Sequence, residues 1–129
     1  MECAQFVERL RSFIAEHFES KPILVGQFYP FDYAFLCAAF SRHAPEAFYG
    51  DNIFGNNFID TKSIVNERNL AARLRGDPEP FPITSLSAPG GLKDTLGIGH
   101  EHESHTALGD VLATRDVLIA LLRHEKKAA

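Results

Sequence analysis

A histidine and two aspartates occupy positions where acid–base or metal chemistry is possible. His105 and Asp110 lie five positions apart at the expected start of the last helix, so their side chains can reach one pocket from adjacent turns. Asp32 lies between large apolar residues directly after a short apolar run, an arrangement that holds a carboxylate at the rim of a pocket. A solvated polar helix end is the alternative explanation for the first pair.

Two helices and one strand are expected to position Asp32. Residues 3–18 carry apolar residues at spacings of three and four, which predicts an amphipathic helix. Residues 22–28 contain a short β-rich run and predict a buried central strand. A helix over 31–40, beginning just after Pro30, then places Asp32 near the strand's C-terminal end. The expected inward residues of the two helices are Phe6, Val7, Leu10, Phe13, Ile14, Phe18, Phe35, Leu36, Ala39 and Phe40.

The second half of the chain is predicted to contain three more helices and a long connection. Asp60 and Thr61 are typical of a helix N-cap and first turn. Residues 76–91 hold four of the seven prolines, so no helix can run through them. A short helix over 92–98 and the longest periodic stretch, 105–124, follow. The expected inward residues of that stretch are Leu108, Val111, Leu112, Leu118, Leu121 and Leu122.

Length and composition predict one soluble domain. The 129 residues suit a single core, and no stretch approaches the roughly 18 apolar residues of a membrane span, so we expect a cytoplasmic protein without a membrane partner. A formal charge of −4 argues against broad coating of nucleic acid, which needs many Lys and Arg contacts to phosphate. A nuclease that grips one strand end remains open. Cys3 and Cys37 are expected to be buried thiols without a disulfide framework.

Four sequence blocks follow one another along the chain. They are Phe-Asp-x-x-Phe-Leu at 31–36, Ile-Asp-Thr at 59–61, Gly-Leu-x-x-x-Leu-Gly-Ile at 91–98 and His-x-Ala-Leu-x-Asp-x-x-Ala-Thr at 105–114. In this order and spacing, over about residues 23–122, the chain resembles the DEDDh-type 3′–5′ exonucleases.

The resemblance implies an α/β fold of the RNase H-like type, dominated by helices, with one central strand and an incomplete N-terminus. In that family four carboxylates hold two Mg²⁺ or Mn²⁺ ions, and a histidine accepts a proton from the attacking water. Asp32 and Asp110 then correspond to metal ligands and His105 to the general base. The implied substrate is the 3′ end of single-stranded DNA or RNA. Asp60 matches a frequent family position, which a helix N-cap explains equally well.

The chain also departs from the family pattern. The first motif, Asp-x-Glu on an opening strand, should precede the first helix, where residues 1–4 read Met-Glu-Cys-Ala. Half of the metal carboxylates are then missing, so we expect the 129 residues alone to be inactive or nearly so. The sequence is a fragment of a longer reading frame, is completed by a partner chain, or is a non-catalytic pseudo-exonuclease that binds nucleic acid or protein. The uncovered strand edge further predicts a homo-oligomer or a covering partner chain.

Aromatic residues near Asp32 are candidates for contact with substrate. Phe28, Tyr29 and Phe31 can stack on a terminal base or can pack in the core. Gln27 and Phe28 replace a His-Asn dipeptide that is frequent in the family. The region 43–58 is expected to be a loop, with an extended piece at 56–59 as an option.

A histidine-rich run precedes the last helix. His100, His102 and His105 fall within six residues, a density that can bind Zn²⁺ or Ni²⁺. A polar loop leading into the helix is the alternative.

Overall fold

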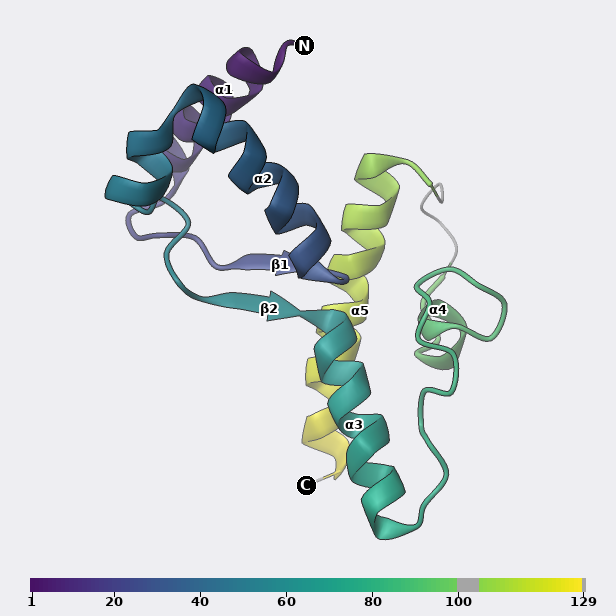
Figure 1. Cartoon of the computed structure of the whole chain (residues 1–129). Helices are drawn as coiled ribbons and strands as arrows, with labels where there is room; N and C mark the ends of the chain where they lie inside the picture. The colour runs from purple at the N-terminus through teal and green to yellow at the C-terminus, as the bar shows by residue number, and fades with distance from the viewer. Residues whose placement is uncertain (100–104, 129) are drawn as a thin grey trace. The chain divides into compact units, whose positions relative to one another are not determined.

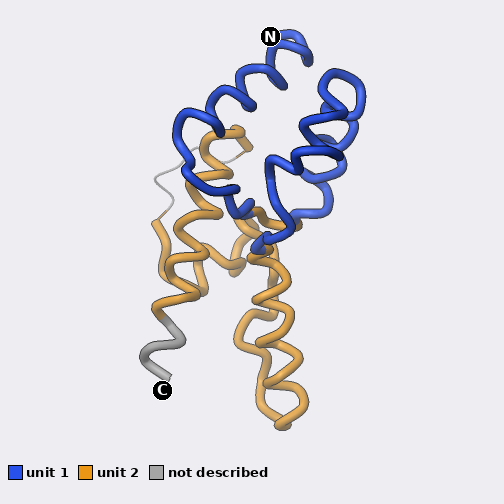
Figure 2. Tube along the Cα trace, turned by 90° about the vertical axis from the view of Figure 1, so that its left-hand side faces the viewer, with its two compact units in different colours: residues 1–25, 29–59 blue, residues 26–28, 60–129 orange. Residues whose placement is uncertain are grey.

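The computed structural model describes residues 1–99 and 105–128, and in this part the chain forms two compact units (Figures 1 and 2). Unit 1 comprises Met1–Val25 and Tyr29–Ile59, and unit 2 comprises Gly26–Phe28 and the chain from Asp60 onward. Whether the units form one domain, as the chain length suggests, stays a prediction.

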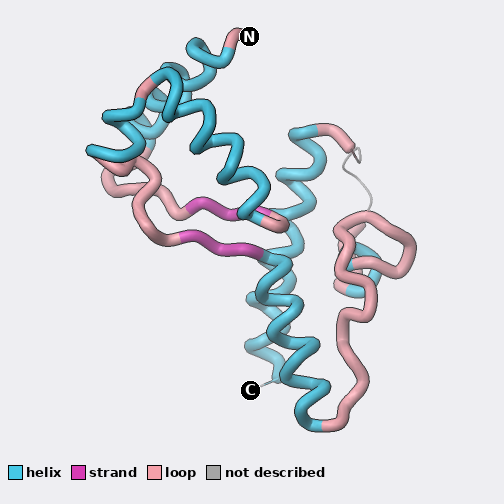
Figure 3. Tube along the Cα trace, viewed as in Figure 1, coloured by secondary structure: helices cyan, strands magenta, loops and turns pink. Residues whose placement is uncertain are grey.

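Unit 1 contains two helices, a short π-helix and most of a two-stranded sheet. The two strands lie side by side (Figure 3), and their arrows in Figure 1 point in the same direction. Helices α1 and α2 pack against each other. The elements in chain order are α1 (Cys3–His17), β1 (Leu24–Gly26), α2 (Tyr29–His43), the π-helix η1 (Glu46–Gly50) and β2 (Phe58–Asp60).

The sheet differs from the prediction of one strand over 22–28. Strand β1 is shorter than expected, and β2 pairs with it, so the part of the chain that the structure describes has two strands. Strand β2 overlaps the extended piece considered at 56–59. The Asn and Gly residues beside it obscure the strand pattern in the sequence. The coarser prediction, a helix-dominated α/β chain, is confirmed.

The core of unit 1 is built from fewer side chains than periodicity predicts. Val7 from α1 and Phe40 from α2 are fully buried and pack with Phe48 and Phe54 from the segment after α2. Both helices carry phenylalanine on more than one face, so not all of these rings can reach one core. Four rings expected to face inward are instead 41% to 65% exposed: Phe6, Phe13, Phe18 and Phe35.

Unit 2 contains the remaining helices, α3 (Thr61–Arg75), α4 (Leu92–Thr95) and α5 (Ala107–Ala128). Helix α5 packs against both α3 and α4. Between α3 and α4 the chain forms no helix or strand, as its proline content predicts. Within the described part of the chain, no helix combines the length and apolar character needed to cross a membrane.

The buried face of α5 differs from the predicted one. Ala113, Val117 and Leu121 are buried at intervals of four, and the last two join the core of unit 2. Leu108 and Val111 are exposed although periodicity predicts burial, as is Leu122. Apolar residues surround most of this helix, so spacing alone does not identify the face that packs.

A pair of hydrogen bonds fastens the long connection to α3. The buried Asn69 side chain donates to the Phe81 carbonyl oxygen at 2.7 Å and accepts from the Phe81 N–H at 3.0 Å. The Phe81 ring joins the core of unit 2 with Val65 and Leu92. The amide thus satisfies two backbone groups that packing has removed from water.

Asn69→Ala tests this pair. We expect a loss of about 2–3 kcal/mol in the free energy of unfolding, because the N–H and C=O of Phe81 stay buried without partners. The measurement is urea denaturation followed by circular dichroism. Asn66→Ala, at an exposed position one turn earlier, is the matched control and should change stability by less than about 0.5 kcal/mol. Equal losses in the two variants would show that the pair does not hold the connection.

Candidate functional site

His105 and Asp110 come together at the start of α5. The His105 N–H donates to Asp110 Oδ1 at 3.3 Å, and the Thr106 hydroxyl accepts from the Gly109 N–H at 3.1 Å, which caps the helix. The His105 side chain is exposed and Asp110 is half-buried. The carboxylate also lies in the first turn, where the helix dipole favours negative charge. The local sequence therefore fixes an acid beside a histidine, and their catalytic roles stay predictions.

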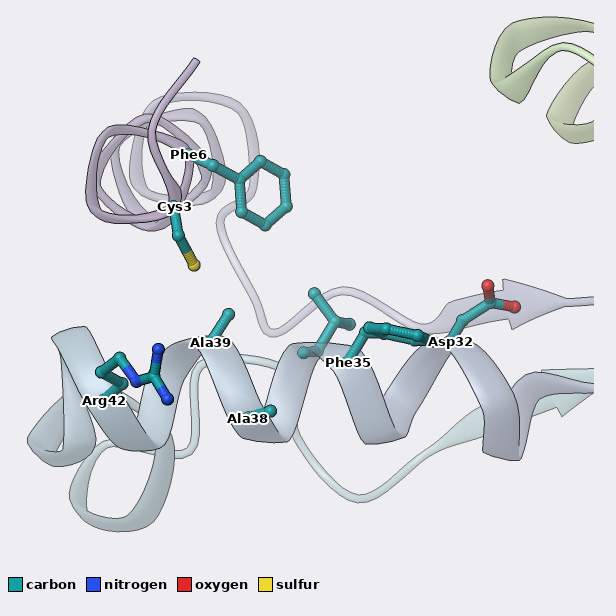
Figure 4. Close-up of a pocket in the computed structure, with 8 residues that line it drawn as sticks. Cys3, Phe6, Asp32, Phe35, Ala38, Ala39 and Arg42 are labelled. Atoms are coloured by element: carbon teal, nitrogen blue, oxygen red, sulfur yellow. The ribbon is translucent and has the colours of Figure 1, made fainter.

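Asp32 lies in the first turn of α2 at the edge of a groove in unit 1. The groove has a volume of about 570 Å³ and runs between α1 and α2 (Figure 4). Figure 4 shows the Asp32 carboxylate at one end and the Arg42 guanidinium at the other. The remaining lining is mostly apolar: Cys3, Phe6, Phe35, Leu36, Ala38 and Ala39. Asp32 belongs to unit 1 and the His105–Asp110 pair to unit 2, so their convergence stays a prediction.

Asp60 acts as the N-cap of α3. Its Oδ1 accepts from the Lys62 N–H at 3.0 Å and from the Phe28 N–H at 2.8 Å. Its Oδ2 accepts from the Ser63 hydroxyl at 3.1 Å, and the residue is buried. Donors of the protein thus engage both carboxylate oxygens, which confirms the capping explanation for this position.

Side-chain hydrogen bonds tie the segment Gly26–Phe28 to the rest of unit 2. The buried Thr61 hydroxyl donates to the Gly26 carbonyl oxygen at 3.1 Å and also lies against Gln27 Oε1. The Gln27 amide donates to the Thr84 carbonyl oxygen at 3.2 Å. Gln27, which stands where the family often has histidine, therefore has a structural use here.

The three aromatic candidates for substrate contact differ in exposure. Tyr29 is 9% exposed and stacks on Phe58, with ring centroids 4.5 Å apart. Phe31 is exposed on α2. Phe28 is also exposed, and Lys62 Nζ lies 5.1 Å from its ring centroid. Phe28 and Phe31 thus offer ring surface to a ligand, whereas Tyr29 is occupied by its neighbours.

Lys62 is a residue that the sequence reasoning missed. It lies in the first turn of α3, where the helix dipole disfavours a cation. The signal in the sequence is a lysine directly after the N-cap Asp60 and the first helical residue Thr61.

The described residues do not assemble a metal site by themselves. No group of three or more His, Cys, Asp or Glu side chains is placed to hold an ion in residues 1–99 and 105–128. The histidines at 100 and 102 lie outside the described residues. Cys3, expected to be buried, is exposed because it lies in the first turn of α1, and Cys37 is half-buried.

Comparisons of the chain with protein-family models, with curated proteins and with solved structures found no match. The resemblance to the exonuclease family therefore rests on the order and spacing of the four sequence blocks alone.

The burial of Tyr29 predicts a change of stability at alkaline pH. Burial, followed by the charges of Tyr33 and Cys37, raises the pKa of Tyr29 from 10.0 to about 12. The fold favours the neutral phenol, so its contribution is complete below the unfolded pKa and is lost as pH rises from 10.0 to about 12. The expected loss of unfolding free energy is about 2–3 kcal/mol.

Urea denaturation at a series of pH values measures this loss, and tyrosinate absorbance reports the ionisation itself. Tyr29→Phe should flatten the decline, although part of it remains because burial also raises the pKa of Tyr33. Tyr49→Phe, at an exposed position, is the control and should keep most of the decline, because the charge of Tyr49 is the smallest of the causes that raise the pKa of Tyr33. A decline of the same size in Tyr29→Phe would contradict the assignment to Tyr29.

Proposed function

We propose that the chain is part of a 3′–5′ exonuclease-type nucleic-acid hydrolase with an RNase H-like fold, acting on single-stranded DNA or RNA ends. The observation that carries the proposal is the half-buried Asp110 carboxylate held beside His105 at the start of α5. Additional support comes from β1, which leads within three residues into α2 and its first-turn Asp32. Asp32 and Asp110 thus lie at the positions where the matching sequence blocks of the exonuclease family contain an acid.

The proposed roles follow the chemistry of each group. Asp32 and Asp110 would contribute carboxylate oxygens to Mg²⁺ or Mn²⁺, hard cations that prefer oxygen ligands. Such ions supply charge stabilisation at phosphorus. His105, whose side chain is exposed at the helix start, would take the proton of the attacking water. The His105 backbone N–H donates to the Asp110 carboxylate, which ties the acid to the backbone of the residue that carries the proposed base.

A second candidate function is binding of nucleic acid or a protein without cleavage. It is favoured because few candidate catalytic groups come together in the described residues. One candidate metal ligand, Asp110, lies at the start of α5 beside the backbone of the proposed base His105, and Asp60 is engaged as a cap. A pseudo-exonuclease that binds nucleic acid or a protein partner needs no more than this. A covering partner chain or self-association at the strand edge belongs to the same proposal.

A shared metal site predicts that one ion perturbs two helix starts. Added Mn²⁺ should broaden the amide NMR signals of the first turns of α2 and α5 together, because paramagnetic relaxation falls steeply with distance. Asp110→Asn should weaken the broadening at both starts. The last turn of α3 serves as the internal control, since this helix of fifteen residues carries it about 20 Å from the Phe28–Asp60 contact at its start. Broadening at only one of the two predicted starts would end the shared-site proposal.

Activity is expected only after the carboxylate set is completed. The 129-residue chain should be inactive or nearly so on single-stranded oligonucleotides with Mg²⁺ or Mn²⁺, because each missing carboxylate removes charge and geometry. An Asp-x-Glu strand fused ahead of residue 1 should restore 3′–5′ digestion. His105→Asn should then lower the rate by about 10²- to 10⁴-fold, the usual contribution of a general base.

The matched control for the activity assay is Glu67→Gln, at an exposed position on α3, which should leave the rate unchanged. Digestion by the unfused chain that Asp110→Asn abolishes would show that these 129 residues complete the site themselves. Oligonucleotide binding without digestion in the fused protein would favour the pseudo-exonuclease.

A further inference from the structure

Phe28 has a backbone conformation that its side chain does not favour. In the described part of the chain three residues other than glycine have positive φ: Phe28 at 63°, Asn52 at 47° and His105 at 64°. Asn and His enter the left-handed region several times more often than other residues, whereas a bulky residue there is an outlier. Such a conformation persists only where the surroundings hold it, and it concentrates at ligand sites.

Hydrogen bonds of Phe28 and of the two residues before it hold it in this conformation. Its own N–H donates to the buried Asp60 carboxylate at 2.8 Å. The preceding residues are fixed by Thr61, through the Gly26 carbonyl oxygen, and by the Gln27 amide, which reaches Thr84. All of these residues belong to unit 2, so the arrangement is complete within one compact unit.

Burial of the ring does not explain the strained backbone. The Phe28 side chain is 51% exposed, whereas the next residue, Tyr29, is 9% exposed and lies in an aromatic stack. The strained residue therefore displays its ring rather than packing it. Exposed aromatic rings on rigid backbone are the platforms on which single-stranded nucleic acids stack their bases.

A cation accompanies the ring. Lys62 Nζ lies 5.1 Å from the Phe28 ring centroid, a cation–π distance. Its place in the first turn of α3 opposes the helix dipole, so the helix itself gains nothing from this charge. The ammonium lies over one face of this half-exposed ring, which leaves the opposite face for a planar base while the charge meets the phosphate of the same nucleotide.

We propose that Phe28 and Lys62 form a subsite for one nucleotide of a single-stranded nucleic acid. The base stacks on the Phe28 ring, and the Lys62 ammonium pairs with the adjoining phosphate. The proposal rests on the nucleic-acid function proposed above and names the residues that bind the substrate.

The test is fluorescence anisotropy of a labelled oligothymidylate in EDTA, so that binding is measured without digestion. Phe28→Ala should raise Kd about fivefold or more, the usual effect of losing one stacked base, while Phe28→Trp should retain affinity. Lys62→Gln should weaken binding and lower the salt dependence by about one phosphate contact. Phe13→Ala is the matched control, because that ring is 50% exposed in unit 1 and should leave Kd unchanged.

A melting experiment tests the strain separately. Phe28→Ala and Phe28→Gly both remove the ring, but only alanine keeps the left-handed penalty. Phe28→Gly should therefore melt about 3 °C above Phe28→Ala. Both variants should lose affinity alike, which separates the loss of the ring from a loss of folding.

Several results would overturn the subsite. They are unchanged affinity in Phe28→Ala, equal affinity for an oligonucleotide that lacks its bases, and no binding by the unsubstituted protein. Digestion by the fused protein would then still support the exonuclease proposal. Binding that depends on Phe28, with no digestion by the fused protein, supports the subsite and ends the exonuclease proposal.

Discussion

The hydrogen bonds of one buried carboxylate determine the local structure of two segments that are distant in sequence. Asp60 caps α3 through the Lys62 N–H and also accepts from the Phe28 N–H. A buried carboxylate is stable only while donors replace its lost hydration. The start of α3 and the conformation of Phe28 are therefore one linked feature, because removal of either donor leaves the carboxylate less well solvated. The proposed nucleotide subsite is built on this link, since Phe28 and Lys62 are the residues it joins.

Features of the fold that depend on neighbouring residues are predictable from the sequence. The N-cap at Asp60 and the irregular connection over 76–91 follow from local side chains and prolines. The packing faces do not follow in this way, because α5 carries apolar residues around most of its surface and only tertiary packing selects Val117 over Val111. Strand β2 is also difficult to predict, since a strand of three residues carries no period of its own.

The same distinction, between features set by neighbouring residues and features set by distant ones, applies to the candidate site. His105 and Asp110 are five positions apart, and the contact between them runs from the His105 backbone N–H to the Asp110 carboxylate. That their side chains share one pocket stays a prediction. The left-handed backbone of Phe28 depends on a carboxylate 32 residues away, and the burial of Tyr29 depends on Phe58. Neither is encoded in the few residues on each side. Lys62 becomes a candidate because its ammonium lies over the Phe28 ring, and this contact forms only when the chain folds.

The boundary between the two units has a consequence for how the chain can be divided. The polypeptide passes between them at residues 25–26, at 28–29 and at 59–60, so unit 2 includes a tripeptide drawn from within unit 1. Neither unit is a continuous segment, and no single cut yields both of them intact. Gene truncation or exchange of one half with a related protein would leave the start of α3 without Gly26–Phe28. An intact unit 2 therefore requires residues 26–28, which lie between the two segments of unit 1 in the sequence.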